Sequence, residues 1–148
     1  MASLNSNYLL SVESAISGGS IALFNGADFV SATSGGCSVS RAEDLLPRII
    51  DLLREAGVER NDIHRIAISL GPGSYTGLRI GIATVMGLCR GLGIDYIGVP
   101  LFEAIADAHE HGPSLMAVPM GRSDICVSEA GSGNARVASY DDLKAELD

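Results

Sequence analysis

Short apolar runs separated by small and polar residues dominate this chain and predict β-strands before any helix appears. Asn25-Gly26 lies between two such runs and is a strong hairpin signal. The first three strands are therefore expected to form an antiparallel meander. Strands are predicted at residues 8–13, 20–24, 28–32, 66–70, 95–99, 115–118 and 125–128.

The first helix is predicted from about Arg41 to Ala56. Ser40 and Glu43 have the spacing of a capping box at its start. Pro47 lies inside this range, and proline removes a backbone donor and disfavours the helix interior. We therefore expect either a bend or a late start near Leu45.

The apolar stripe of this helix is wider than one buried face needs. Ala42, Leu45, Ile49, Leu52 and Ala56 share one side of a helical wheel, and Leu46, Ile50 and Leu53 extend it. A helix that packs on a single sheet needs a stripe of roughly 100°. The excess predicts that a second helix or a partner protein covers part of it.

The sequence is organised around a glycine-rich stretch, Gly71 to Gly81, between an apolar strand and a second helix that runs to about Arg90. Ser74 or Thr76 can cap this helix. A Walker loop would need a lysine where Leu78 stands, and the third glycine comes one place late for a dinucleotide fingerprint. A turn built for close packing remains the simplest interpretation. The predicted loop comprises Gly71, Pro72, Gly73, Ser74, Tyr75 and Thr76.

Four glycines punctuate the second helix, at positions 77, 81, 87 and 91. An interior glycine costs a helix roughly 1 kcal/mol relative to alanine. Close backbone approach could offset that cost at Gly81 and Gly87. The approaching group could be the chain's own sheet or another protein, and the sequence leaves both possibilities open.

The full string from Gly71 to Gly81, with Ile82-Ala83-Thr84 after it, resembles the TsaB (YeaZ-type) family of tRNA threonylcarbamoyladenosine biosynthesis, once grouped with glycoprotease M22-like proteins. The resemblance continues at 98–106, is weaker at 8–14 and 45–47, and covers roughly residues 8–127. It implies an α/β fold of the actin-like, ribonuclease-H-like half-fold type: a mixed sheet with helices on its faces and a truncated second lobe. Residues 1–113 would form the actin-like N-terminal domain, and residues 114–148 the remnant of the second lobe with a flexible tail.

Composition narrows the possible partners. The 148 residues suffice for an ordinary hydrophobic core, and no apolar run approaches a membrane span. The net charge of −8 argues against direct contact with nucleic acid. Cys37, Cys89 and Cys126 form no paired motif, which fits a reducing cytoplasm and predicts neither a disulfide framework nor a zinc site.

Few residues are candidates for catalysis or for binding a ligand. Glu13 ends the first predicted strand, where actin-like ATPases carry an acid and the resembling family usually has aspartate, so it could mark a vestigial nucleotide site or simply cap a turn. The resemblance places Pro119 where a second acid would be needed. Ser74 has no nominated base, and Arg79 is expected to meet a carboxylate. We therefore predict no catalytic residues, no metal and no cofactor.

Two functions are considered. The first is a non-catalytic partner protein that dimerises and binds the TsaD-like catalytic subunit implied by the resemblance, with a TsaE-like ATPase as a further partner. The alternative is an actin-fold ATPase or kinase relative, or a glycoprotease-like peptidase. The predicted interface comprises Leu46, Ile50, Leu53, Gly77, Arg79, Gly81, Thr84 and Leu88.

Overall fold

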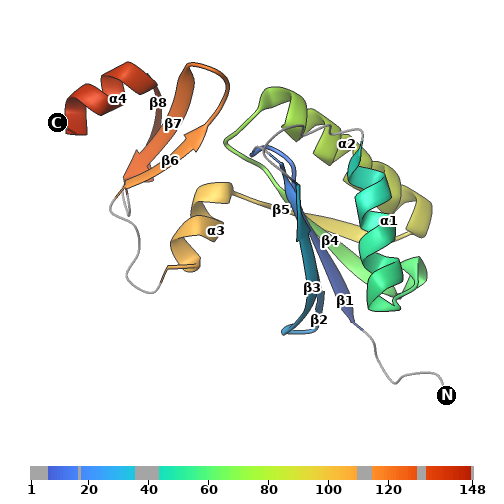
Figure 1. Ribbon diagram of the computed structural model, residues 1–148. Helices are drawn as coiled ribbons and strands as arrows, with labels where there is room; N and C mark the ends of the chain where they lie inside the picture. Colours follow the sequence, from blue (N-terminus) through green and yellow to red (C-terminus); the bar gives the residue numbers. More distant parts are fainter. Residues whose placement is uncertain (1–6, 17, 36–43, 110–114, 130–132, 148) are drawn as a thin grey trace.

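A five-stranded mixed sheet forms the larger part of the molecule (Figure 1). The computed structural model describes residues 7–16, 18–35, 44–109, 115–129 and 133–147. The strand order is β3-β2-β1-β4-β5, with β1 antiparallel to β2 and parallel to β4. The strands are β1 (Tyr8–Glu13), β2 (Ser20–Asn25), β3 (Asp28–Ser34), β4 (Ile63–Ser69) and β5 (Asp95–Val99).

The core lies on the sheet face that two helices cover. The helices α1 (Leu45–Ala56) and α2 (Tyr75–Leu92) lie side by side on that face (Figure 1). Alternation along the strands turns one set of side chains toward the helices. This buried set comprises Leu10, Val12, Ile21, Leu23, Ile66 and Ile68.

The first helix starts late, as Pro47 predicted. It begins at Leu45, so the proline occupies the third helical position and no backbone donor is lost from the interior. The predicted capping residues Ser40 and Glu43 lie outside the described residues. A left-handed Gly57 ends the helix, with a φ angle of 66°. A short 3-10 helix, η2 (Arg60–Asp62), leads into β4.

The helix α3 (Leu101–Asp107) lies on the opposite side of the sheet from α1 (Figure 1). It follows β5 after Pro100, which is its N-cap. The amide of Leu101 donates to the carbonyl of Gly71 at 2.8 Å, so the start of α3 is bonded to the glycine-rich loop. This position brings the helix to the carboxyl ends of β1 and β4.

A second sheet has its own core. Its antiparallel strands are β6 (Leu115–Pro119), β7 (Asp124–Glu129) and β8 (Ala135–Ser139), in that order. The helix α4 (Tyr140–Leu147) buries Leu143 against Ile125, Val127 and Ala138.

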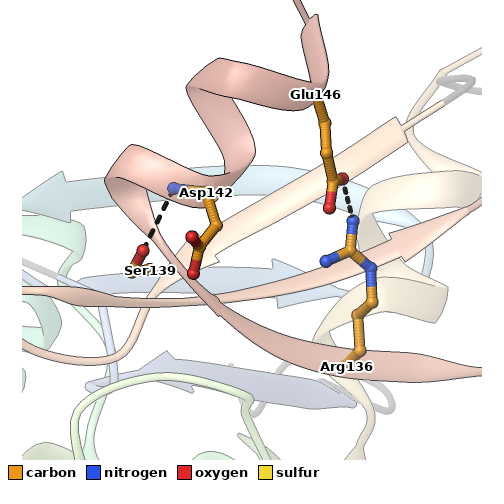
Figure 2. A network of polar contacts seen from close by, with 4 residues as sticks. All are labelled: Arg136, Ser139, Asp142 and Glu146. Atoms are coloured by element: carbon orange, nitrogen blue, oxygen red, sulfur yellow. Dashed lines mark hydrogen bonds and ion pairs between the residues drawn. The ribbon is translucent and has the colours of Figure 1, made fainter.

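Two polar contacts join α4 to β8 (Figure 2). Ser139 Oγ accepts a hydrogen bond from the amide of Asp142 at 3.1 Å, and Arg136 forms an ion pair with Glu146. The sequence predicted a short helix here but took the region as a flexible tail and missed β8. The short helix is confirmed as α4, whereas the strand at residues 135–139 was not predicted.

Replacing Ile66 by alanine should lower the free energy of unfolding by about 2–5 kcal/mol, because its side chain is fully buried and its loss leaves a cavity. Ile97 on the adjacent strand is 49% exposed, so Ile97→Ala should cost less than about 1 kcal/mol. Urea denaturation of both variants measures the difference. Equal losses would contradict the assignment of the core to the helix-covered face.

Candidate functional site

The glycine-rich loop connects β4 to α2 through a tight turn. Gly71 has a φ angle of 80°, a conformation that favours glycine, and its amide donates to Ser69 Oγ at 3.2 Å. Ser74 caps α2, since its Oγ accepts a hydrogen bond from the amide of Gly77 at 3.2 Å. The loop thus uses its polar groups to start the helix.

The turn after β1 packs tightly against the start of α2. The amide of Ser74 donates to the carbonyl of Ala15 at 2.7 Å, and Ser14 Oγ donates to the carbonyl of Gly77 at 2.9 Å. A Cβ atom on Gly77 would overlap the carbonyl oxygen of Ser14, and one on Gly81 would overlap Ser14 Oγ. These two glycines, with Gly73 against Ala15, let a turn and a helix approach at backbone distance.

Arg48 of α1 holds the same turn from the other side. Its Nη1 donates to the carbonyl of Gly18 at 2.9 Å, and its Nη2 lies 3.3 Å from the carbonyl oxygen of Gly19 and 3.4 Å from that of Thr33. A planar guanidinium can satisfy several carbonyls at once, which a lysine ammonium does less well. The turn is therefore bonded to both helices.

The Glu13 side chain stabilises this turn by accepting hydrogen bonds from its backbone amides. Its Oε1 accepts from the amide of Ala15 at 2.5 Å and from that of Ile16 at 3.1 Å, and its Oε2 lies 3.2 Å from the Ile16 nitrogen. Burial raises the pKa of the Glu13 carboxyl above its usual 4.5, against the lowering effect of these amides. The carboxylate is thus engaged by its own turn.

A small hollow lies beside Glu13 at the carboxyl ends of β1 and β4. Its volume is about 160 Å³, and Ser11, Ser69 and Ala104 are among its lining residues. Nucleotide-sized ligands occupy pockets of roughly 300–1,000 Å³. The hollow in this conformation is therefore too small for a nucleotide.

Arg79 lies over an aromatic ring. Its guanidinium carbon is 5.4 Å from the centroid of Tyr75, whose side chain is 71% exposed. Within the described part of the chain Arg79 has no carboxylate partner. The carboxylate expected for Arg79 would thus have to come from outside the described residues.

The exposed side of α1 and α2 is apolar and hollowed. Leu46 and Ile50 on α1 are 42% and 55% exposed, and Tyr75 on α2 is 71% exposed. A hollow of about 620 Å³ lies beside Leu46 along α2, and one of about 410 Å³ adjoins Tyr75 and Arg79. We call this the two-helix surface: Leu46 and Ile50 with Tyr75, Thr76, Arg79, Ile80, Ala83, Thr84, Gly87, Leu88 and Gly91.

The helix glycines divide into two groups. Gly77 and Gly81 are buried against Ser14, whereas a Cβ atom on Gly87 or Gly91 would meet nothing within 4 Å. The first pair serves packing within the chain, and the second pair leaves a groove open beside Leu88. The sequence left these two roles open for the interior glycines Gly81 and Gly87.

Three of the residues predicted for the interface lie elsewhere. Leu53 packs in the chain's own core, and Gly77 and Gly81 face the turn after β1, so these three residues are not part of the exposed surface. Leu46, Ile50, Arg79, Thr84 and Leu88 do lie on the two-helix surface.

Sequence reasoning missed Ser14, Arg48 and Met86. Gly77 and Gly81 are four residues apart and therefore share one face of α2, and this spacing was the available signal for a close backbone neighbour such as Ser14.

The described cysteines are free and buried. Burial raises the pKa of the Cys89 thiol, with a smaller contribution from the Asp95 carboxylate, and burial also raises that of Cys126. Cys37 lies outside the described residues. In the part of the chain that the structure describes, no group of three histidine, cysteine or acidic residues could hold a metal ion, and no helix could span a membrane.

Comparison with known families gives a match over most of the chain. Residues 36–146 match the family "TsaD: tRNA N6-adenosine threonylcarbamoyltransferase". The tRNA threonylcarbamoyladenosine biosynthesis protein TsaB of Escherichia coli is 35% identical over 98 residues, which are 66% of this chain and 42% of that protein. The chain belongs to the TsaD family and is of the TsaB/YeaZ type.

Other relatives agree. The TsaB protein of Buchnera aphidicola from Acyrthosiphon pisum is 28% identical over 102 residues, covering 69% of this chain and 46% of that protein. YeaZ from Pseudomonas aeruginosa superposes with a TM-score of 0.69 at 27% identity, covering 90% of this chain and 65% of that chain. The expected actin-like fold is therefore confirmed. The chain spans about half the length of the curated relatives it matches.

Gly77→Ala and Gly87→Ala should change stability in opposite directions. The Gly77 variant should lose about 1–3 kcal/mol of unfolding free energy, because its methyl group would overlap the Ser14 carbonyl. The Gly87 variant should gain up to about 1 kcal/mol, because open space surrounds it and alanine favours helix. Chemical denaturation measures both values. A stabilised Gly77 variant would contradict the close contact between the turn and α2.

Glu13 should make stability depend on pH in a particular direction. Since its pKa is raised in the folded state, its contribution is complete below pH 4.5 and is lost as pH rises through the folded-state pKa. The unfolding free energy of the wild type should thus fall relative to Glu13→Gln as pH rises from 4.5. Denaturation of both proteins across that range provides the measurement, and an unchanged difference would contradict the prediction.

Proposed function

We propose that this chain is a non-catalytic partner protein in tRNA threonylcarbamoyladenosine modification. In this proposal the two-helix surface pairs with a second copy or with a TsaD-like catalytic subunit. Support for the pathway comes from the family match and from the names of the relatives. A TsaE-like ATPase is a further partner in the proposal, and the cytoplasm is its compartment.

One observation carries the proposal: large apolar side chains are exposed beside hollows on neighbouring helices. Leu46 lines a groove in which Gly87 and Gly91 leave the backbone of α2 accessible, and Ile50 is exposed one turn further along α1. Small residues let a partner helix approach closely, and exposed aliphatic side chains supply the apolar area of an interface. These side chains are not part of the hydrophobic core of the larger sheet, so a partner protein could bury them.

The two-helix surface also carries a charged side chain, that of Arg79, which could orient a partner. Tyr75 and Arg79 stack at the α2 end of the groove, where a guanidinium with no described partner is presented beside an aromatic ring. Tyrosine and arginine are enriched among residues that dominate binding energy at interfaces. A carboxylate on the partner is the expected counterpart of Arg79.

The position of Glu13 supports a non-catalytic role. Its carboxylate accepts hydrogen bonds from the amides of Ala15 and Ile16, and the hollow beside it holds only about 160 Å³. A group committed to its own turn is poorly placed to act on a substrate. The alternative of an actin-fold ATPase, a kinase relative or a peptidase would need a larger site near this carboxylate.

Ile50→Asp should abolish dimerisation and binding of a TsaD-like subunit while the monomer stays folded, because the side chain is exposed in the monomer and a charge would be buried in the complex. Phe29→Asp is a matched control, since Phe29 is equally apolar and 64% exposed but lies on β3. Sedimentation and calorimetry with the purified subunit measure association. Substitution of Leu53 or Gly81 would be uninformative, because both are buried.

Two results would overturn the proposal. Unaltered association of Ile50→Asp would place the interface elsewhere. Micromolar binding of ATP with magnesium by the isolated chain, lost in Glu13→Ala, would favour the enzyme alternative. Circular dichroism and thermal unfolding of each variant confirm that it is folded before either result is interpreted.

A further inference from the structure

Among the described residues, the strand β5 is an edge of the larger sheet. It pairs with β4 on one side and is the last strand in the order β3-β2-β1-β4-β5. The carbonyl of Val99 accepts from the amide of Leu70, so Val99 directs its backbone toward the interior of the sheet. Since successive residues alternate, Tyr96 and Gly98 direct their backbone N–H and C=O groups outward.

This edge lacks the features that normally prevent strand pairing. Between Asp95 and Val99 there is no lysine, proline or bulge, and Tyr96 and Ile97 are 48% and 49% exposed. Open edges with exposed apolar residues are templates for an added strand. The opposite edge strand, β3, differs because Arg48 of α1 lies against the carbonyl of Thr33.

A large hollow adjoins the edge. Its volume is about 710 Å³, and its lining includes Met86, Arg90 and Tyr96 together with Arg65 and Asp95. Register places Arg65 and Asp95 as neighbours on one face of the sheet, while Arg90 belongs to α2 on the other face. Asp95 is thus the register neighbour of Arg65, and neither Arg65 nor Arg90 has an ion-pair partner among the described residues.

We propose that the β5 edge binds an extended acidic segment of another protein by strand addition. The backbone of that segment would pair with Tyr96 and Gly98. A carboxylate of the segment would meet Arg90, and the exposed side chains of Met86 and Tyr96 would line the same face. This surface adjoins the two-helix surface at Gly87, which lines the hollows of both, but its occupant does not depend on the proposed tRNA function.

Charge and geometry favour this occupant over a second copy. In an antiparallel pair of copies, the Tyr96 end of one β5 strand would lie against the Gly98 end of the other. The Gly98 end of β5 carries no carboxylate that could meet Arg90. Nucleic acid is also a poor fit, since a phosphate backbone requires a broad cationic surface, whereas the charged residues that line this hollow are Arg65, Arg90 and Asp95.

The test uses a labelled blocked peptide, Thr-Glu-Val-Glu-Val-Glu-Val-Thr, and its counterpart with lysine for every glutamate. Fluorescence anisotropy should show the acidic peptide binding at least about tenfold more tightly, because a charge-assisted hydrogen bond contributes roughly 1.5–3 kcal/mol. Hydrogen exchange should slow at the amides of Tyr96 and Gly98 when the acidic peptide is bound.

Matched variants separate the proposed contacts from general charge. Arg90→Glu should weaken acidic-peptide binding about tenfold or more, for the reason just given. Arg122→Glu makes the same change in net charge at an exposed position and should leave binding within about twofold. Tyr96→Pro removes an outward donor and should abolish binding, whereas Tyr96→Val keeps it.

Several outcomes would overturn the proposal. These are no binding of the acidic peptide at millimolar concentration, equal losses for Arg90→Glu and Arg122→Glu, or protection of amides other than those of Tyr96 and Gly98. Concentration-dependent protection of these amides without peptide would indicate a second copy, and tighter binding of a uridine oligonucleotide would indicate RNA. Ile50→Asp should still bind the peptide, which separates this test from that of the two-helix surface.

Discussion

The contact between the turn after β1 and the glycine face of α2 is the constraint on which the larger part of the molecule depends. Ser14 and Ala15 reach the helix through hydrogen bonds to Gly77 and Ser74. Such an approach is possible only without Cβ atoms at Gly77 and Gly81. The helix cost of these glycines is therefore offset by packing, and the glycine-rich loop gains its role from this contact.

The same contact shapes the region around the acid at the end of β1. Glu13 holds the turn by accepting its amides, so the acid at the end of β1 acts in local structure. The turn then fixes the helix start, and α2 turns its remaining glycines, Gly87 and Gly91, toward solvent. Under the proposed function, the exposed apolar surface of α1 and α2 is the part of the molecule that a partner protein would contact.

The sequence predicted most of the fold because its signals were local. Alternation and the Asn25-Gly26 turn gave the meander, Ser74 gave the helix cap, and Pro47 gave the late start of α1. The strand at Ala135–Ser139 was missed because its polar and small residues, next to a glycine-rich segment, carry little strand signal; pairing with β7 and cover from α4 stabilise it. Tertiary packing overrides weak propensity at such positions.

The site was predicted only in part. A wide apolar stripe on a helix does not show which of its side chains are buried by the rest of the chain and which stay exposed. Leu53 and Ile50 both extended that stripe, yet only Ile50 is exposed. Likewise, the four glycines of α2 look alike in the sequence but lie in two different environments. Gly77 and Gly81 pack against Ser14, whereas Gly87 and Gly91 do not. A contact between residues more than sixty positions apart leaves no mark in local periodicity.

Arg48 adds a mechanical consequence. It ties α1 to Gly18 and Gly19, while Ser14 ties α2 to the neighbouring residues of the same turn. Both helices are thus hydrogen-bonded to the same short turn, which sets their positions relative to each other within the monomer. In the proposed association, docking on these two helices would therefore cost little further conformational entropy, which favours affinity at a given contact area.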